Sequence, residues 1–248
     1  MAFATGTFLF LAAALGGAIN SVAGGGSFVA FPALLFAGAA PIPANATNTI
    51  ALFPGSAASA VAYRRELRDV RRELVPLGAA ATIGGVAGSA MLLRTPEHAF
   101  VLLIPWLLLF ATALFSFGGA VAGRVRGQVP VSVAVVVQLV IGVYGGYFGG
   151  GMGIMMLAVL SLMGMTDIHR MNALKTVLSA LANGVAVIAF IAAGAVDWGR
   201  GVVMIAGGVL GGYAGAAIAR RVDAKRVRLL VLAIAWTMTA YFFWRTYR

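Results

Sequence analysis

The distribution of charge along the chain constrains the fold more than any other feature of the sequence. No charged side chain occurs before Arg64. Further uncharged runs cover residues 74–93, 99–123, 128–166, 176–196, 201–219 and 229–244. A soluble domain has about 25% charged residues, whereas this 248-residue chain has 10% and is 61% hydrophobic. Because a helix needs about 20 apolar residues to cross a bilayer, the sequence predicts an all-α polytopic membrane protein with material for about eight spanning segments.

The net charge of +11 is carried mostly by short segments between these apolar runs. Such segments set membrane topology, since cytoplasmic loops are enriched in Lys and Arg, so we expect no nucleic-acid partner. The chain lacks cysteine, which removes thiolate catalysis, disulfides and cysteine metal sites. The acidic residues and both histidines lie in or beside predicted loops. We therefore expect no enzyme, no metal site and no cofactor.

The two halves of the chain repeat one another. Gly24-Gly25-Gly26 matches Gly149-Gly150-Gly151 at an offset of 125 residues (149 minus 24). Farther along, Gly84–Gly88 matches Gly211–Gly215 at an offset of 127 (211 minus 84). These matches predict two homologous membrane repeats of about four helices each, and in each repeat the first helix is broken at the triple glycine.

The repeat divides the chain into a first membrane repeat over 1–123, a cytoplasmic linker over 124–130 and a second membrane repeat over 131–248. The helices expected in the first repeat cover 3–22, 27–38, 44–63, 74–93 and 99–121. Those expected in the second repeat cover 131–147, 152–164, 170–193, 199–219 and 227–244.

Loop charges favour inverted repeats. Loop 64–73 holds five arginines and loop 220–228 holds four arginines and a lysine, so both are expected in the cytoplasm. The repeat, however, relates loop 220–228 to the charge-poor segment around Arg94, which is expected outside. Equivalent loops on opposite sides mean inversion, provided that 131–147 and 152–164 form a hairpin that enters and leaves on one side. Inverted repeats are common in secondary transporters.

The triple glycines are the first candidate site. Each glycine lowers helix propensity by about 1 kcal/mol, and a broken helix at membrane depth is tolerated only where protein or a cavity covers it. The break frees backbone N–H groups at the start of the next helix, where anions bind. The alternative is that these glycines only allow close helix packing. The candidate residues are Gly24, Gly25, Gly26 and Ser27 in the first half and Gly149, Gly150 and Gly151 in the second.

A polar stretch opens the helix that follows the first break. It contains Asn45, Thr47 and Asn48, whose side chains can donate hydrogen bonds to an oxyanion without carrying charge. Asn45 and Asn48 share one helix face with Ser56 and Ser59. Capping of the helix start is the alternative, but it accounts for one of these residues rather than four.

Lys175 is the only charged residue well inside an apolar segment of the second half. An ionisable residue at membrane depth is a functional-site hypothesis by default. Asn172 shares its face, together with Ser179 and Asn183, so this face is expected to line a path for an anion. The alternative is that Lys175 snorkels toward the segment boundary at Asp167.

The ordered set of motifs has a counterpart in a known family. The motifs are Gly24–Gly26 with Pro32, Ala46–Asn48, Gly149–Gly151, Asn172–Lys175 and Val196–Trp198. Together they resemble the sulfite exporter TauE/SafE family of membrane transporters. The resemblance implies two homologous halves and export of sulfite, sulfoacetate or other small organic or sulfur-containing anions. The second half departs from the Ala-Thr-Asn form, since it reads Met171-Asn172-Ala173.

These features predict a secondary transporter of a small anion in the cell inner membrane, embedded in the lipid bilayer. Backbone N–H groups and Lys175 would hold the anion, while Thr47, Asn48 and Asn172 would orient it. Sulfite, an organosulfonate and a small carboxylate are the candidate substrates. A passive anion channel and a membrane assembly partner without transport are the alternatives.

Overall fold

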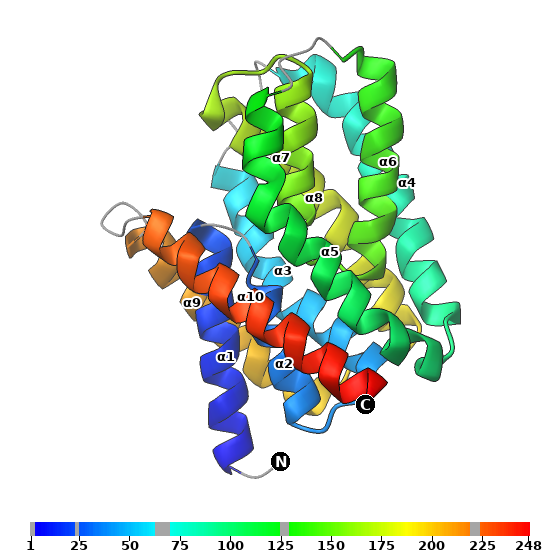
Figure 1. Cartoon of the computed structure of the whole chain (residues 1–248), viewed down its shortest axis with the longest axis vertical. Helices are drawn as coiled ribbons and strands as arrows, with labels where there is room; N and C mark the ends of the chain where they lie inside the picture. The colour runs from blue at the N-terminus through cyan, green and yellow to red at the C-terminus, as the bar shows by residue number, and fades with distance from the viewer. Residues whose placement is uncertain (1–2, 23–24, 63–69, 125–128, 219–223) are drawn as a thin grey trace.

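The protein is all-helical over the described residues, as the sequence predicted. The computed structural model describes residues 3–22, 25–62, 70–124, 129–218 and 224–248, which contain helices and no β-strand (Figure 1). The helices are α1 (Phe3–Val22), α2 (Ser27–Phe36), α3 (Pro41–Ala62), α4 (Arg71–Arg94), α5 (Glu97–Arg124), α6 (Val131–Tyr147), α7 (Met152–Leu162), α8 (Ile168–Ala192), α9 (Trp198–Ile218) and α10 (Ala224–Tyr247). Gly24 and most of the expected linker, 125–128, lie outside the described residues.

Helices of this chain are long and apolar enough to cross a membrane. The candidate spans are Phe3–Ser21, Arg71–Arg94, Glu97–Phe117, Arg170–Ala192 and Arg226–Tyr247. Large apolar side chains also cover the outer surface, and Ile83, Val140 and Ile188 are 61%, 63% and 67% exposed. Apolar surface of this extent fits lipid rather than water. The protein is therefore a multi-pass membrane protein.

Within the described residues each half contributes five helices when the short helices α2 and α7 are counted separately. About four were expected in each half, with the first one broken. Helix α3 begins at Pro41, three residues earlier than expected, because proline is compatible with the first helical turn, where its missing N–H is not needed. The helices α5 and α10 extend past their apolar cores to Arg124 and Tyr247.

Several helix pairs pack backbone against backbone, since a Cβ atom at Gly208 of α9 would overlap the carbonyl oxygen of Ala51 in α3 and one at Gly85 of α4 would overlap that of Ala182 in α8. Helix α1 likewise lies on α9 and α4 on α6, so each of these pairs joins a helix from one half of the chain to one from the other. Glycines make these two contacts possible, since a Cβ atom at Gly211 would overlap the carbonyl oxygen of Ala14 and one at Gly88 would overlap that of Val143. Small residues of this kind let membrane helices approach closely.

Side-chain contacts join α2 to the end of α6 and α5 to α10. Phe31 of α2 packs edge to face on Phe148, directly after α6, with ring centroids 5.6 Å apart. The helices α5 and α10 meet through a buried hydrogen bond of 3.1 Å between the hydroxyls of Thr112 and Thr239. Figure 1 shows that α1 and α6 begin at opposite ends of the molecule and that both chain ends lie at the same end.

Candidate functional site

The first half is interrupted between Val22 and Ser27. Gly25 has a φ of +90°, and the N–H of Phe28 turns back to the Gly25 carbonyl at 3.0 Å. Ser27, the first residue of α2, accepts a hydrogen bond of 3.2 Å on its hydroxyl oxygen from the side-chain amide of Asn48. The hydrogen of the Ser27 hydroxyl therefore points away from Asn48 and is available to another acceptor.

Asn45 connects the same face of α3 to the second half. Its side-chain amide donates to the carbonyl oxygen of Tyr147 at 3.0 Å. Tyr147 is the last residue of α6, where backbone carbonyls have no intrahelical partner. The α3 face thus contacts Ser27, directly after the first break, and Tyr147, directly before the second. The sequence predicted this face, but not its two partners.

The second half is interrupted between Tyr147 and Met152. Gly149 and Gly151 have φ values of +81° and +77°, a conformation that favours glycine. The hydroxyl of Tyr144 donates to the Gly150 carbonyl oxygen at 2.8 Å and holds the glycine run in place. The N–H of Ile154 bonds to the Gly151 carbonyl at 3.0 Å. The preceding amides of Met152 and Gly153 have no intrahelical acceptor because they lie in the first turn of α7.

Lys175 of α8 lies against this first turn. A Cβ atom placed on Gly153 would be 3.4 Å from Cδ of Lys175 and 4.0 Å from its Cε. The half-buried Lys175 side chain makes no hydrogen bond or ion pair with any residue of the described ranges. A cationic side chain therefore lies at the positive end of a helix, next to a glycine break, without a protein anion beside it.

Other residues of the α8 face follow α7 along its length. The Ser179 hydroxyl lies 3.3 Å from the sulfur of Met156, and the Asn183 side-chain oxygen is 4.0 Å from a Cβ placed on Gly149. Asn172 is half-buried and has no hydrogen bond within the described part of the chain. The structure thus brings Lys175 and Ser179 to α7 and Asn183 to Gly149 in the second break. The path for an anion along this face stays a prediction.

The side chain of Thr47 contacts the start of α9 rather than a helix break. Its hydroxyl oxygen accepts a hydrogen bond of 3.0 Å from the N–H of Asp197, just before α9, and its methyl group would meet a Cβ on Gly201 at 3.5 Å. Thr47 is fully buried in this position. In this structure the Thr47 hydroxyl therefore fixes the start of α9, whereas Asn45 and Asn48 contact the breaks.

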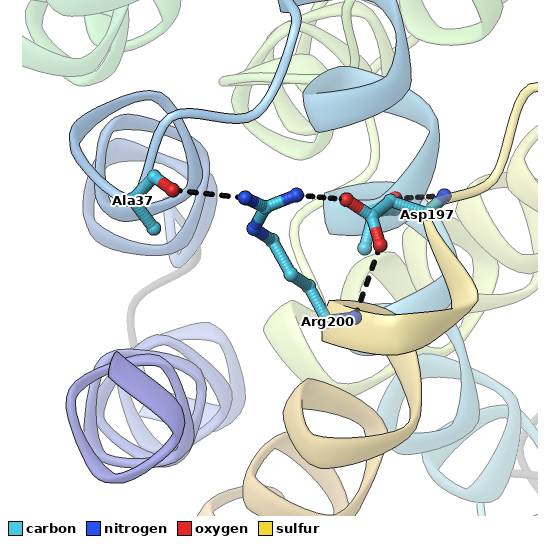
Figure 2. A network of polar contacts seen from close by, with 4 residues as sticks. Ala37, Asp197 and Arg200 are labelled. Carbon is cyan, nitrogen blue, oxygen red and sulfur yellow. Dashed lines mark hydrogen bonds and ion pairs between the residues drawn. The ribbon is translucent and has the colours of Figure 1, made fainter. Parts of the chain in front are cut away.

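A polar cluster that the sequence reasoning missed joins α9 to α2. Figure 2 shows the guanidinium group of Arg200 between the carboxylate of Asp197, with which it forms an ion pair, and the carbonyl oxygen of Ala37. The bond to Ala37, directly after α2, is 3.0 Å. Asp197 also accepts a 3.1 Å bond from the Arg200 N–H, which makes it the cap of α9. The sequence feature that could have predicted this cap is an aspartate, Asp197, directly before an apolar helix.

This architecture defines a multi-pass helical membrane protein in which the short helices α2 and α7 follow α1 and α6. Residues 9–242 match the sequence profile of the family described as sulfite exporter TauE/SafE. The chain belongs to this family, and it is a membrane transporter. The match covers both halves of the chain, in agreement with the resemblance carried by the motifs.

Relatives from bacteria are described in similar words. The probable membrane transporter protein YfcA of Escherichia coli K12 is 27% identical over 241 residues, which cover 94% of this chain and 87% of that protein. A probable membrane transporter protein of Haemophilus influenzae is 27% identical over 90% of this chain and 88% of its own length. The probable membrane transporter protein ORF9 of a Sinorhizobium species is 33% identical over 46% of this chain and 44% of its own. No solved structure matches the chain.

Proposed function

We propose that the protein is a secondary transporter of a small anion in the cell inner membrane and that the anion binds at the start of α7. One observation carries this proposal: the side chain of Lys175 lies 3.4 Å from the Cβ position of Gly153, beside the glycine break. The positive end of a helix and an ammonium group then act on the same space. Both favour a negatively charged ligand.

The cost of keeping Lys175 inside the protein supports the same proposal. A lysine at the centre of a bilayer costs about 2.5–3.5 kcal/mol on insertion scales, and such residues usually pair with an opposite charge. Lys175 has no such partner within the described ranges. A bound oxyanion would supply the missing charge and would accept hydrogen bonds from Met152 N–H, Gly153 N–H and the lysine. Sulfite, an organosulfonate and a small carboxylate all carry this group.

The first break would complete the site with neutral donors. The Ser27 hydroxyl is free to donate because Asn48 occupies its oxygen. The glycines Gly24, Gly25, Gly26, Gly149, Gly150 and Gly151 would form the two breaks that free the N–H groups of the site. Asn172 would orient the anion from the cytoplasmic side of α8. Thr47 would act indirectly, through the start of α9.

Inverted repeats would give this transporter its alternating access. The helix pairing supports them. The repeat relates α1 to α6 and α9 to α4, and α1 packs on α9 as α6 packs on α4. The bond between Thr112 and Thr239 supports them too, because these residues are 127 positions apart and match at the offset of the later repeat. The opposite starts of α1 and α6 fit inversion rather than parallel repetition (Figure 1). The repeats would be 1–123 and 131–248.

Binding of anions to the purified protein tests the proposal. The detergent-solubilised protein is heated with increasing sulfite, sulfoacetate, thiosulfate or acetate, and binding raises its unfolding temperature by mass action. We expect a concentration-dependent rise with at least one anion. Lys175→Ala should weaken this binding by roughly 10-fold to 100-fold, since a charge-assisted hydrogen bond contributes about 1.5–3 kcal/mol. Lys175→Arg should keep most of it.

The control is Arg94→Ala, which removes one exposed positive charge at the end of α4 and leaves Lys175 in place. Unchanged affinity in Lys175→Ala would remove this residue from the site. If no anion shifts the unfolding temperature, the anion proposal is wrong and an assembly role becomes the better account. Saturable uptake with exchange in proteoliposomes separates a transporter from a passive channel.

A further inference from the structure

Two buried amide oxygens lie between the breaks without a hydrogen-bond donor. Asn45 is 1% exposed and Asn48 is 2% exposed. The side-chain oxygen of each makes no hydrogen bond within the part of the chain that the structure describes. Buried polar atoms in folded proteins are nearly always paired, so each of these oxygens requires a specific explanation.

The orientation of Asn45 is fixed by its partner. Its contact at 3.0 Å is the carbonyl oxygen of Tyr147, which can only accept, so the NH₂ group must face Tyr147 and the oxygen must face the other way. Asn48 is less constrained, because the Ser27 hydroxyl can donate or accept. The argument therefore rests on Asn45, and Asn48 is a second acceptor that can turn toward the same ligand.

Asn45 and its neighbour Asn48 lie together beside both breaks. Residues three apart on a helix are neighbours, so Asn45 and Asn48 form one polar patch on α3. This patch touches Ser27 at the start of α2 and Tyr147 at the end of α6. A ligand held by the free N–H groups at a helix start would therefore lie near the amide oxygens of this patch, which accept, as well as near donors.

A metal cation is a poor partner for the two amide oxygens of this patch. The described residues contain no group of three or more His, Cys, Asp or Glu side chains that could hold a metal ion. The start of α2, at Ser27, presents the positive end of a helix, which repels a cation. A hydroxyl group fits better, because it supplies the hydrogen that the oxygen needs and adds no positive charge.

We propose that the Asn45 side-chain oxygen accepts a hydrogen bond from a hydroxyl group of the transported anion, so that the site selects anions that carry an O–H group. This inference rests on the proposed function, and it specifies the substrate class. Hydrogen sulfite, a hydroxyalkyl sulfonate and a hydroxy acid belong to the selected class. Sites that bond a substrate hydroxyl reject analogues without it, because the buried partner is left unpaired.

Two pairs of anions that match in size and charge test the inference on the unaltered protein. The first pair is 2-hydroxyethanesulfonate and propane-1-sulfonate, and the second is glycolate and propionate. We expect the hydroxyl-bearing member of each pair to bind about 10-fold to 100-fold more tightly, measured by calorimetry or thermal shift. Equal affinities within each pair would overturn the inference and leave the proposed function standing.

A variant assigns the preference to Asn45. Asn45→Leu removes the acceptor, so the two members of each pair should bind with equal affinity, while a preference that persists would overturn the role of Asn45. The matched control is Gln138→Leu, because Gln138 of α6 is also 1% exposed and also has an unpaired amide atom, but lies outside the patch. The Gln138→Leu variant should prefer the hydroxyl-bearing anion of each pair as strongly as the unaltered protein does. If neither anion of any pair binds, this inference fails, whereas the proposed function fails only if sulfite, sulfoacetate, thiosulfate and acetate do not bind either.

Discussion

Both helix breaks contain three consecutive glycines, but these glycines have different roles in the two breaks. Gly26, which precedes α2, has ordinary right-handed helical angles (φ −55°, ψ −28°), and a Cβ atom there would overlap the carbonyl oxygen of Gly16. Gly151, which precedes α7, has a φ of +77°, and the nearest atom to its Cβ position belongs to Ala111 at 3.4 Å. The first glycine is required by close packing and the second by backbone conformation.

The breaks also differ in the side chains that face them. Ser27 and Asn48 form a neutral pair at the first break, whereas the cationic Lys175 lies at the second. Residues that match at the repeat offset thus occupy different physical environments. One break is built around packing and neutral hydrogen bonds, and the other around charge. Substitutions at equivalent glycines should therefore have unequal effects.

The largest effect is expected from Gly26→Ala. The added methyl group overlaps backbone, which cannot rotate away, so α1 and α2 must separate. Overpacking of this kind costs typically 1–3 kcal/mol and occasionally more, and we expect about 3 kcal/mol here. Thermal unfolding of the detergent-solubilised protein measures it. Gly26→Asn should be no better tolerated than Gly26→Ala, and a milder effect of Asn would contradict the packing explanation.

An intermediate effect is expected from Gly151→Ala. The methyl group has room, but the left-handed conformation costs an L-residue roughly 1–2 kcal/mol. Asparagine tolerates this conformation better than alanine. The same unfolding assay should therefore rank Gly151→Asn above Gly151→Ala in stability, opposite to the expectation for Gly26. If both substitutions at Gly151 were neutral, the observed φ would not be required for the fold.

The smallest effect on stability is expected at Gly153. Its Cβ position is at ordinary contact distance from Lys175, so Gly153→Ala should change stability by less than about 0.5 kcal/mol and leave anion affinity intact. Gly153→Val adds two methyl groups on the lysine side and should weaken anion binding by displacing Lys175. Equal affinities for the two variants would show that the position of Lys175 does not control binding.

The helices themselves could be predicted closely from the sequence. The expected ranges 3–22 and 131–147 agree with α1 and α6, because each apolar run ends at a glycine run and a helix cannot continue easily through it. Other ends moved by a few residues, and at α4 charged side chains extend the helix beyond its apolar run. Arg71 and Arg94, for example, are the first and last residues of α4.

The partners of the polar residues could not be predicted. Helical periodicity places Asn45 and Asn48 on one face, and it places Thr47 about 100° from Asn48, but it does not say which helix each face meets. Asn45 bonds to a residue 102 positions away and Thr47 to one 150 positions away. These contacts depend on how α6 and α9 pack around α3, which no local pattern in the chain encodes.

The close contact of α1 with α9 and of α4 with α6 bears on how the molecule can move. Where backbone touches backbone, no side chain can change rotamer to absorb a displacement, so each pair is expected to behave as one rigid body. Each rigid body takes one helix from either half of the chain. Sliding is then confined to seams where side chains intervene, such as the contact of Phe53 on α3 with Gly184 on α8. The expected repeat, which is one half of the chain, is therefore not the unit that we expect to move.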